Sequence, residues 1–215
     1  MKRFKFVLFA LAFLGIFSSS FSEDKKIDSL YKEMNLENVV NYDVFKSALE
    51  GFYKIKDRKK EIVTIIDFTK PSTKERFYVL DLKEKHMLYK SVVSHGKNSG
   101  GNMATSFSNQ NGSNKSSLGF FLTENTYFGK NGYSLRLDGL EEGINDKAKE
   151  RAIVVHGANY ANPSAISGLG RLGRSLGCPA LPTNISKEVI NVIKDGSVMY
   201  IHGNDNQYLA KSHLI

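Results

Sequence analysis

The sequence predicts a mainly β domain with flanking helices, built as a sandwich or barrel-like sheet and preceded by an N-terminal helical hairpin. Two observations lead to this prediction. From residue 61 onward, short runs of β-branched and aromatic residues alternate with polar turns. Before them, residues 23–60 place apolar side chains at helical spacing. Strands that follow one another at such short intervals favour a sandwich or barrel-like sheet over β–α–β units.

The chain opens with the pattern of a secretory signal peptide, which we place at residues 1–22. Three basic residues precede an apolar block from Phe6 to Phe17, and Ser20-Phe21-Ser22 puts small residues at the cleavage site. The apolar block is shorter than the roughly 20 residues that a transmembrane helix needs, so an uncleaved anchor is the weaker alternative. The expected location is therefore the periplasm or the cell envelope.

Length and charge set limits on the predicted mature chain. Its roughly 190 residues are enough for one domain with a full core and a small appendage. We place the appendage at residues 23–60 and the domain at residues 61–215. The whole chain carries a net charge of +8, and removal of the three positive charges of the signal peptide leaves +5. This moderate basicity suits an anionic wall surface but is also ordinary for a soluble protein.

Two amphipathic helices are predicted in the appendage. The first covers residues 27–36, and the second begins after Asn41 or Asp43 as its N-cap. Their apolar stripes favour a hairpin packed on the main domain, while a helix pair that binds a partner is the alternative. The stripe of the second helix consists of Phe45, Ala48, Leu49, Phe52 and Tyr53.

Three strands are predicted next, at residues 62–68, 76–80 and 87–93. Each is rich in β-branched and aromatic residues, and short polar turns separate them, which favours an antiparallel meander. Residues 94–117 are rich in Ser, Asn and Gly and are expected to form a long loop. His95, at the start of this loop, is expected to be a turn histidine rather than a substrate contact.

The second half of the domain adds further strands and one helix. A glycine-rich turn that starts at Tyr127 is expected to precede an alternating strand ending at Leu137. Asn184 is expected to cap a helix that ends near Gly196. The apolar run at residues 197–202 is expected to be the strand that closes the sheet.

Two residues in the stretch 152–182 carry the expected chemistry. A β-branched run ends in His156-Gly157, which predicts a buried strand that delivers an imidazole to its C-terminal end. Cys178, the only cysteine, lies between a glycine and a proline, so its backbone is bent and its amide can face a ligand. A thiol that gives its proton to an imidazole becomes a nucleophile. The pair predicts acyl transfer through a thioester.

Each of these residues taken alone has a simpler interpretation. A lone cysteine is usually a small buried hydrophobe, and a lone histidine is usually a satisfied surface or core residue. Their joint setting favours chemistry, because an exported chain with one cysteine has no internal disulfide and Gly-Cys-Pro packs poorly in a core. His202 also ends an apolar strand in His-Gly and is the internal rival of His156, but nothing resembling a nucleophile loop follows it.

These residues resemble a known signature. His156-Gly157 followed by Ser175-Leu176-Gly177-Cys178 is similar to the box of murein L,D-transpeptidases of the YkuD type, in which a His-Gly pair precedes Ser/Thr-His-Gly-Cys. Leu176 stands where that family has histidine, and Pro179-Ala180 stand where it usually has an apolar residue and arginine. The phrase from Gly170 to Ala180 resembles a YkuD-like branch of murein L,D-transpeptidase catalytic domain proteins. The resemblance runs from about the first helix to the C-terminus.

The resemblance implies a fold and a set of roles. The fold would be the L,D-transpeptidase-like (YkuD) β-sandwich or barrel-like domain. Cys178 would be the nucleophile and His156 its base, Gly157 would orient the imidazole through its carbonyl, and the amides of Gly177 and Cys178 would form the oxyanion hole. The substrate would be a peptidoglycan stem peptide, and a carbapenem-type β-lactam could acylate the thiol. No cofactor is implied.

Substrate contacts are expected from the loop before the cysteine. Arg171 and Arg174 suit a substrate carboxylate, because a guanidinium binds a carboxylate in a fork. Bracing of the loop is a nearly equal alternative for both arginines. Ser175 is also placed among the substrate-binding residues. Tyr127 and Tyr133 could each supply a phenol to the cleft, and the sequence does not choose between them.

Other function classes are disfavoured. Five dispersed histidines and one cysteine show no spacing typical of a zinc site, so no metal is expected. Nucleic-acid binding is not expected either, because the Gly-Arg-Leu-Gly-Arg run is short and isolated. An L,D-carboxypeptidase or amidase that hydrolyses the same bonds stays open, as does a wall-binding module without activity. The acceptor amine, the crosslink type and the oligomeric state stay open as well.

Overall fold

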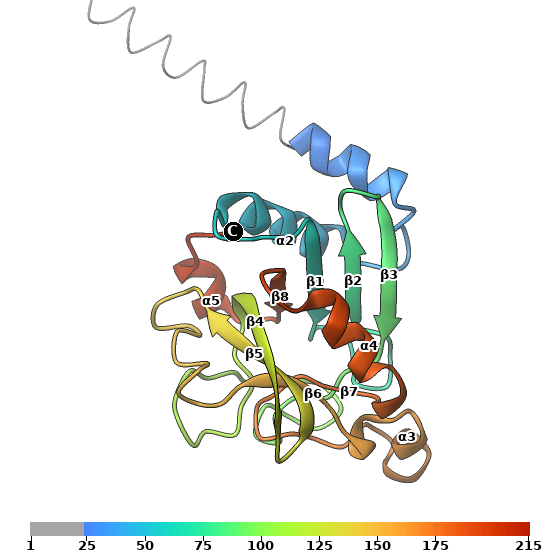
Figure 1. Ribbon diagram of the computed structural model, residues 1–215, viewed down its shortest axis with the longest axis vertical. Helices are drawn as coiled ribbons and strands as arrows, with labels where there is room; N and C mark the ends of the chain where they lie inside the picture. The colour runs from blue at the N-terminus through green and yellow to red at the C-terminus, as the bar shows by residue number, and fades with distance from the viewer. Residues whose placement is uncertain (1–23) are drawn as a thin grey trace, which may run out of the picture. The chain divides into compact units, whose positions relative to one another are not determined.

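The structure, a computed structural model, describes residues 24–215, and the predicted signal peptide at residues 1–22 lies outside them. Two compact units are distinguished, of which the first ends at Lys46 and the second runs from Ser47 to Ile215. The domain division predicted at residue 60 stays a prediction. Within the described part of the chain, none of the helices is long and apolar enough to cross a membrane. Figure 1 labels the helices and strands.

The first unit holds the start of the predicted helical hairpin. Residues 24–33 are helical, and α2 (Tyr42–Lys54) begins in this unit and continues into the second. Of the two predicted caps, Asn41 is the one that caps α2, because its Oδ1 accepts a backbone N–H of the first turn over 3.1 Å, and Asp43 lies inside the helix. The ring of Tyr31 packs edge-on against that of Tyr42 at a centroid distance of 5.1 Å, which joins the two helices.

The predicted antiparallel meander is formed by β1 (Ile62–Asp67), β2 (Phe77–Asp81) and β3 (His86–Ser91). Nearly all residues of β1 and β2 are buried, as expected for apolar strands that are covered on both faces. The carboxylate of Asp81 accepts the backbone N–H groups of Lys83 and Glu84 over 3.0 and 2.9 Å. This short polar turn therefore sends the chain back as β3.

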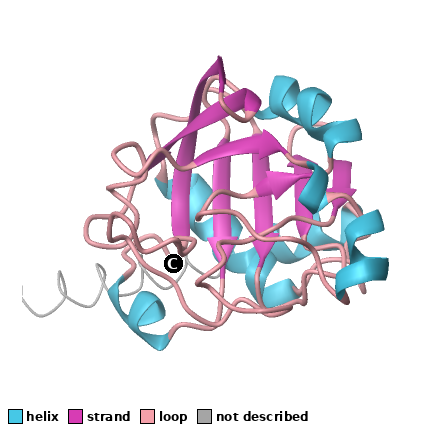
Figure 2. Cartoon of the chain, turned by 90° about the horizontal axis from the view of Figure 1, so that it is seen from below, coloured by secondary structure: helices cyan, strands magenta, loops and turns pink. Residues whose placement is uncertain are grey.

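The remaining strands complete one eight-stranded sheet within residues 24–215. They are the hairpin of β4 (Gly119–Gly129) and β5 (Gly132–Gly139), followed by β6 (Val154–Gly157), β7 (Ala180–Leu181) and β8 (Val198–His202). The order across the sheet is β3-β2-β1-β8-β4-β5-β6-β7. Figure 2 shows the strands of the second unit as a curved layer with helices around it. The predicted mainly β fold with flanking helices is confirmed.

β8 lies at the centre of the sheet rather than at an edge. It pairs in parallel with β1 and antiparallel with β4. The expectation that this last strand closes the sheet is therefore wrong. Residues 198–201 are all buried, and their side chains show no alternation of apolar and polar types. This is the pattern of a strand covered on both faces in the middle of a sheet.

The chain that follows β3 brings the two edges of the sheet together. Ser94 donates its N–H to the carbonyl of Ala180 in β7 over 2.9 Å, and Gly96 forms an isolated bridge with Ser175. These contacts join the β3 side of the sheet to its β7 edge, which gives the predicted barrel-like domain. The closing contacts come from the start of the segment predicted as a loop at residues 94–117.

The β4–β5 hairpin differs from its prediction. Tyr127 belongs to the end of β4 and pairs with Ser134 of β5, so the turn is confined to Lys130 and Asn131. The glycines suggested a longer turn. Cross-strand pairing instead extends the ladder almost to the tip, because the aromatic residues of both strands pack across it.

The helix predicted after the cysteine loop is α4 (Thr183–Ile193), and it begins two residues earlier than expected. Asn184 is therefore inside the helix and is not its cap. The free N–H of Thr183 is instead bound by Oδ1 of Asn162, 2.9 Å away. A side chain distant in sequence thus satisfies a helix terminus that needs a partner. The other short helices are η1 (Asn159–Ala161), α3 (Ser164–Leu169) and α5 (Asn206–Lys211).

Candidate active site

His156 lies near the end of β6, in the strand predicted to deliver it. β6 pairs with β5 on one side and β7 on the other, so His156 has Ser134 and Ala180 as its partners. His156 is 3% exposed, and its Nδ1 lies 3.0 Å from the carbonyl oxygen of Gly157. A neutral imidazole in this bond donates from Nδ1, which leaves Nε2 as an acceptor. Burial lowers the pKa of His156, so the neutral ring is favoured at pH 7.

Gly157 is required by the packing of the strand end. A Cβ on this residue would lie 2.4 Å from the Oγ of Ser186 in α4. Only glycine allows the backbone of β6 to approach α4 this closely. Because the carbonyl that meets the imidazole belongs to the same residue, the glycine and the histidine form one local unit.

Cys178 lies in a tight turn that Ser175 stabilises. The Oγ of Ser175 donates to the carbonyl of Cys178 over 2.6 Å and accepts the N–H of Gly177 over 3.1 Å. Gly177 has a φ of +131°, which glycine adopts far more readily than other residues. Ser175 is 4% exposed, so its hydroxyl serves the turn, and its predicted substrate contact stays a prediction. The N–H of Gly177, which was predicted to form part of the oxyanion hole, donates to the Oγ of Ser175 in this structure.

The thiol of Cys178 faces the backbone of the chain that enters β6. Its Sγ accepts the N–H of Val154 over 3.5 Å and lies 3.6 Å from the carbonyl oxygen of Ala152, to which the S–H can donate. Cys178 is 9% exposed. Burial raises the pKa of its thiol, while the Val154 N–H and the charge of Arg151 act in the opposite direction. The protonated thiol is therefore the favoured form at neutral pH.

The imidazole and the thiol come from neighbouring segments but do not bond to each other. Ala180 is the ladder partner of His156, so Cys178, two residues earlier in the chain, is level with Val154. Diagonal neighbours across two strands lie about 7–8 Å apart. Among the hydrogen bonds of residues 24–215, none joins Cys178 to His156. Contact between the two groups requires rotation of the side chains.

Arg151 is a residue near the thiol that the sequence analysis missed. Its guanidinium donates to the carbonyls of Ser108 and Lys115 over 2.7 and 2.6 Å, which ties the serine-rich loop (residues 94–117) to the chain before β6. Its Nη2 lies 3.5 Å from the position that a Cβ would take on Gly177. The sequence holds no motif that marks this arginine, because its partners are two backbone carbonyls and two serine hydroxyls from a distant segment.

The two arginines predicted to bind a substrate carboxylate have backbone carbonyls as partners. Nη1 of Arg174 donates to the carbonyls of Lys97 and Gly100 over 3.1 and 2.9 Å, which braces the loop after β3. Nη1 of Arg171 donates to the carbonyl of Leu172 over 2.8 Å. These bonds favour the bracing interpretation, and the carboxylate contact stays a prediction for both arginines.

Two other histidines lie in different surroundings. His95 is 1% exposed, and its Nδ1 lies 2.8 Å from Nη2 of Arg76. Burial, and secondly the charge of Arg76, lower the pKa of His95 to about 4, so it is a neutral core residue. His202, the rival of His156, ends β8, and its Nδ1 lies 2.9 Å from the hydroxyl of Tyr200. Since the neighbours of β8 are β1 and β4, His202 is not beside the cysteine turn.

One cavity borders the backbone that holds the thiol. Its volume is about 340 Å³, and its lining includes Tyr127, Arg136, Lys149 and the chain from Ala152 to Val154. Of the two tyrosines left open by the sequence, Tyr127 therefore lines a cavity, whereas Tyr133 donates its hydroxyl to Asn191 over 2.8 Å.

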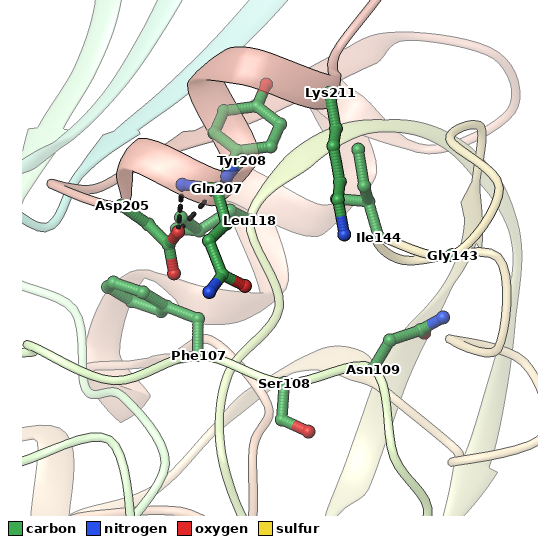
Figure 3. Close-up of a pocket in the computed structure, with 10 residues that line it drawn as sticks. All are labelled: Phe107, Ser108, Asn109, Leu118, Gly143, Ile144, Asp205, Gln207, Tyr208 and Lys211. Carbon is green, nitrogen blue, oxygen red and sulfur yellow. Dashed lines mark hydrogen bonds between the residues drawn. The ribbon is translucent and has the colours of Figure 1, made fainter.

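A second cavity lies between α5 and the serine-rich loop, as Figure 3 shows. Its volume is about 110 Å³, which is below the range of roughly 300–1,000 Å³ that is usual for ligand pockets. The larger cavity is therefore the better candidate for a substrate.

The groups available to the candidate site are the thiol, the imidazole, backbone amides and arginines. Within residues 24–215, no group of three or more His, Cys, Asp or Glu side chains is placed to hold a metal ion.

Comparison with known proteins identifies one family and several similar structures. A family model described as the L,D-transpeptidase catalytic domain matches residues 36–202. The chain is similar to an L,D-transpeptidase from Mycobacterium smegmatis, with 15% identity, a TM-score of 0.41, and coverage of 67% of this chain and 59% of that chain. It is also similar to L,D-transpeptidase 3 from Mycobacterium tuberculosis in complex with a faropenem-derived adduct, with 12% identity, a TM-score of 0.43, and coverage of 67% and 61%.

A third similar structure is the helical cell shape determining protein Pgp2 from Campylobacter jejuni, with 14% identity, a TM-score of 0.45, and coverage of 74% of this chain and 56% of that chain. In each of these three comparisons, the chain spans less than two thirds of the length of the solved structure. No curated protein matches the chain.

Proposed function

Because the chain belongs to the L,D-transpeptidase catalytic domain family, whose model matches residues 36–202, we propose that it is a cysteine acyltransferase acting on peptidoglycan stem peptides. It would be exported to the periplasm or cell envelope and would form or exchange L,D-peptide bonds through a thioester on Cys178. The substrate class comes from the family, and the thioester comes from the residues of the candidate site.

One observation carries the chemical part of the proposal. His156 and Cys178 are placed by adjoining segments of the sheet, two residues out of register, and the bond of Nδ1 to Gly157 leaves Nε2 free to accept a proton. The thiol must rotate away from the carbonyl of Ala152 to reach this nitrogen. Catalytic hydrogen bonds are often long without substrate and shorten when substrate binds.

The proposed reaction begins when Nε2 of His156 takes the thiol proton and the thiolate attacks the carbonyl carbon between an L- and a D-centre. The tetrahedral oxyanion would accept the N–H of Cys178, and also that of Gly177 once this amide leaves the Oγ of Ser175. Each such donor typically lowers the barrier by about 3 kcal/mol. The imidazolium then protonates the departing amine, so the terminal D-residue leaves and the thioester remains.

In the second half of the reaction, an amine of a neighbouring stem peptide attacks the thioester. The imidazole takes the proton that this amine loses, and the thiolate leaves and regains a proton from the imidazolium. A new crosslink results. Water in place of the amine would make the protein an L,D-carboxypeptidase.

A wall-binding module without activity is the second candidate, because one observation favours it. The thiol is nearly buried and contacts the Ala152 carbonyl, and burial raises its pKa. An inert cysteine would have these properties. Slow labelling of Cys178 by a thiol reagent at neutral pH, with no acceleration by stem peptide, would support this candidate.

Product analysis tests the proposal. The purified chain is incubated with tetrapeptide muropeptides, and the products are identified by mass spectrometry. Crosslinked dimers support transfer, and tripeptides alone support hydrolysis. A Cys178→Ala protein is expected to form neither product, and product formation by this variant would overturn the mechanism.

Two mass measurements test the remaining parts. Incubation with a carbapenem is expected to add one molecule to the wild-type chain and none to the Cys178→Ala chain. Expression in a bacterial host is expected to yield an exported chain that starts close to Glu23. A chain that keeps its first 22 residues would contradict the predicted signal peptide.

A further inference from the structure

The larger cavity holds an arginine whose partners leave most of its donors unused. Arg136 lies over the ring of Tyr127, with its guanidinium carbon 4.2 Å from the ring centroid. Its one hydrogen bond among the described residues runs from Nη1 to the amide oxygen of Asn125 over 3.3 Å. A guanidinium has five N–H donors, so at least one side of the fork can still bind an anion.

The strand register places this arginine in line with the cysteine turn. Arg136 pairs with Val154 across β5 and β6, and the N–H of Val154 in turn contacts the Sγ of Cys178. Two strand spacings separate Arg136 from Cys178, which is about 10 Å. Ser134, two residues before Arg136, pairs with His156, so Arg136 is on the face of the sheet that carries the imidazole.

Tyr127 belongs to the same face. It pairs with Ser134 across the hairpin, and its ring reaches back over Gly129, where a Cβ would lie 2.5 Å from the ring. The glycine thus makes room for the ring, and the ring supports the guanidinium through a cation–π contact. This arrangement holds the arginine at the cavity before any ligand binds.

Lys149 and Arg136, the two cations of the cavity lining, differ in whether an acidic side chain pairs with them. Lys149 is neutralised by Glu124 and Asp138, at 2.8 and 3.1 Å. Among the described residues, Arg136 has no acidic side chain within ion-pair distance, and its oxygen partner is a neutral amide. Arg136 is therefore the cation in this lining that can still bind an anion.

We propose that Arg136 binds a carboxylate of the stem peptide in this cavity and so sets the position of the scissile bond at Cys178. The proposal rests on the proposed function, which supplies the substrate class. It assigns to Arg136 the role that the sequence suggested for Arg171 and Arg174. The guanidinium of Arg171 donates to a backbone carbonyl of its own loop, and that of Arg174 donates to two backbone carbonyls of the loop after β3. The carboxylate can be that of the terminal D-residue or that of diaminopimelate.

Direct binding tests the proposal without turnover. In a Cys178→Ala background, calorimetry measures the Kd of a synthetic stem tetrapeptide and of two analogues, one amidated at the terminal D-alanine and one at diaminopimelate. Arg136→Gln is expected to weaken binding of the free peptide by about ten- to a hundredfold, because a charge-assisted bidentate contact is lost. Arg136→Lys keeps the positive charge but cannot make a bidentate contact, so its Kd for the free peptide is expected to lie between those of the parent and of Arg136→Gln.

The amidated analogues identify which carboxylate is bound. The analogue that lacks the bound carboxylate is expected to bind the protein with Arg136 as weakly as the free peptide binds the Arg136→Gln protein. For that analogue, Arg136→Gln should not raise the Kd any further. The matched control is Arg58→Gln, because Arg58 also lies over an aromatic ring, that of Phe52, but is not part of the cavity lining. Its Kd values should equal those of the parent protein.

The two proposals fail in different ways. If the Arg136→Gln protein binds all three peptides within twofold of the parent, or if the parent binds none of them, the carboxylate site is overturned. Turnover is measured in parallel on the chain that keeps Cys178, where Arg136→Gln should raise KM with little change in kcat. Products without any effect of Arg136 would overturn the carboxylate site alone, whereas absence of products and of a thioester would overturn the proposed function.

Discussion

The backbone N–H of Val154 contacts the Sγ of Cys178 over 3.5 Å, so the sulfur is bonded to the backbone of β6 and not to the imidazole of His156. The same sulfur lies 3.6 Å from the carbonyl oxygen of Ala152. The carbonyl favours the protonated thiol, while the amide favours the thiolate. The thiol is therefore held between two backbone groups with opposite effects on its pKa. Burial raises that pKa most, and the charge of Arg151 acts against it.

Arg151 is expected to promote ionisation of the Cys178 thiol. Its charge lowers the thiol pKa, so an Arg151→Met substitution should raise that pKa and lower the thiolate fraction at any pH below it. Alkylation by iodoacetamide at pH 8 should therefore slow, because the thiolate is the form that reacts. The measurement is the alkylation rate across pH.

An Arg151→Lys protein serves as the control for Arg151→Met, because it keeps the charge and changes the bonds to the loop. Its pH midpoint for alkylation should stay close to that of the wild type. Equal midpoints in all three proteins would show that Arg151 acts only by holding the serine-rich loop.

His95 is expected to make the fold sensitive to acid. Its native pKa of about 4 lies below the ordinary 6.5, so between these pH values the unfolded chain binds a proton that the native chain does not. The stability is fully present above pH 6.5 and is lost as the pH falls toward 4, by at most about 3 kcal/mol. Urea unfolding at pH 7 and pH 4.5 measures this difference.

The matching variant is His95→Gln, which removes the titrating group. Burial raises the pKa of Glu141, so protonation of this carboxyl adds stability as the pH falls, opposite to the effect of His95. Glu141 is present in both proteins, so its contribution cancels when they are compared. The loss of stability between pH 7 and pH 4.5 should be smaller in His95→Gln. An equal loss in both proteins would contradict the assignment to His95.

Gly177 is expected to tolerate no side chain. Its φ is +131°, and a Cβ would lie 2.8 Å from the carbonyl oxygen of Lys115. Gly177→Ala should therefore destabilise the fold by about 1–3 kcal/mol and distort the turn that presents Cys178. Gly112→Ala is the matched control, since Gly112 has a φ of +72° and open space around its Cα. Thermal unfolding that shifts equally in both variants would contradict the steric explanation.

Asn162 and Asn184 form a matched pair for the cap of α4. Asn162→Ala removes the acceptor of the Thr183 N–H and should cost about 1 kcal/mol of unfolding free energy. Asn184→Ala, at the position that the sequence suggested as the cap, should change it by less than about 0.5 kcal/mol. Denaturant unfolding of both variants measures the difference. A larger loss of unfolding free energy in Asn184→Ala than in Asn162→Ala would show that Asn184 is the cap.

Much of the fold could be predicted because its signals are local. The runs at β1, β2 and β3 have the β-branched and aromatic composition of strands, and polar turns separate them. Asn41 is one of the two caps that the sequence offers for α2, and its signal is local because its side chain bonds within its own first turn. Such features depend on residues a few positions apart.

The central position of β8 and the cap of α4 could not be predicted in this way. β8 pairs with β1 and β4, which are far from it in the sequence, and α4 receives its cap from Asn162. In the candidate site, His156 and Cys178 stood out by their own neighbours. Arg151 and Arg136 did not, because their roles come from Gly177, Tyr127 and other residues brought near them by folding.

The order of amino acids was sufficient to indicate a mainly β chain of the L,D-transpeptidase type with one thiol and one imidazole of interest, and it predicts export of that chain. Short-range spacing and backbone preferences carry that information. Which groups surround the sulfur depended on the closed sheet, where Val154, Ala152 and Arg151 approach Cys178. Contacts between distant segments set burial and charge, and these two quantities decide whether a thiol is reactive.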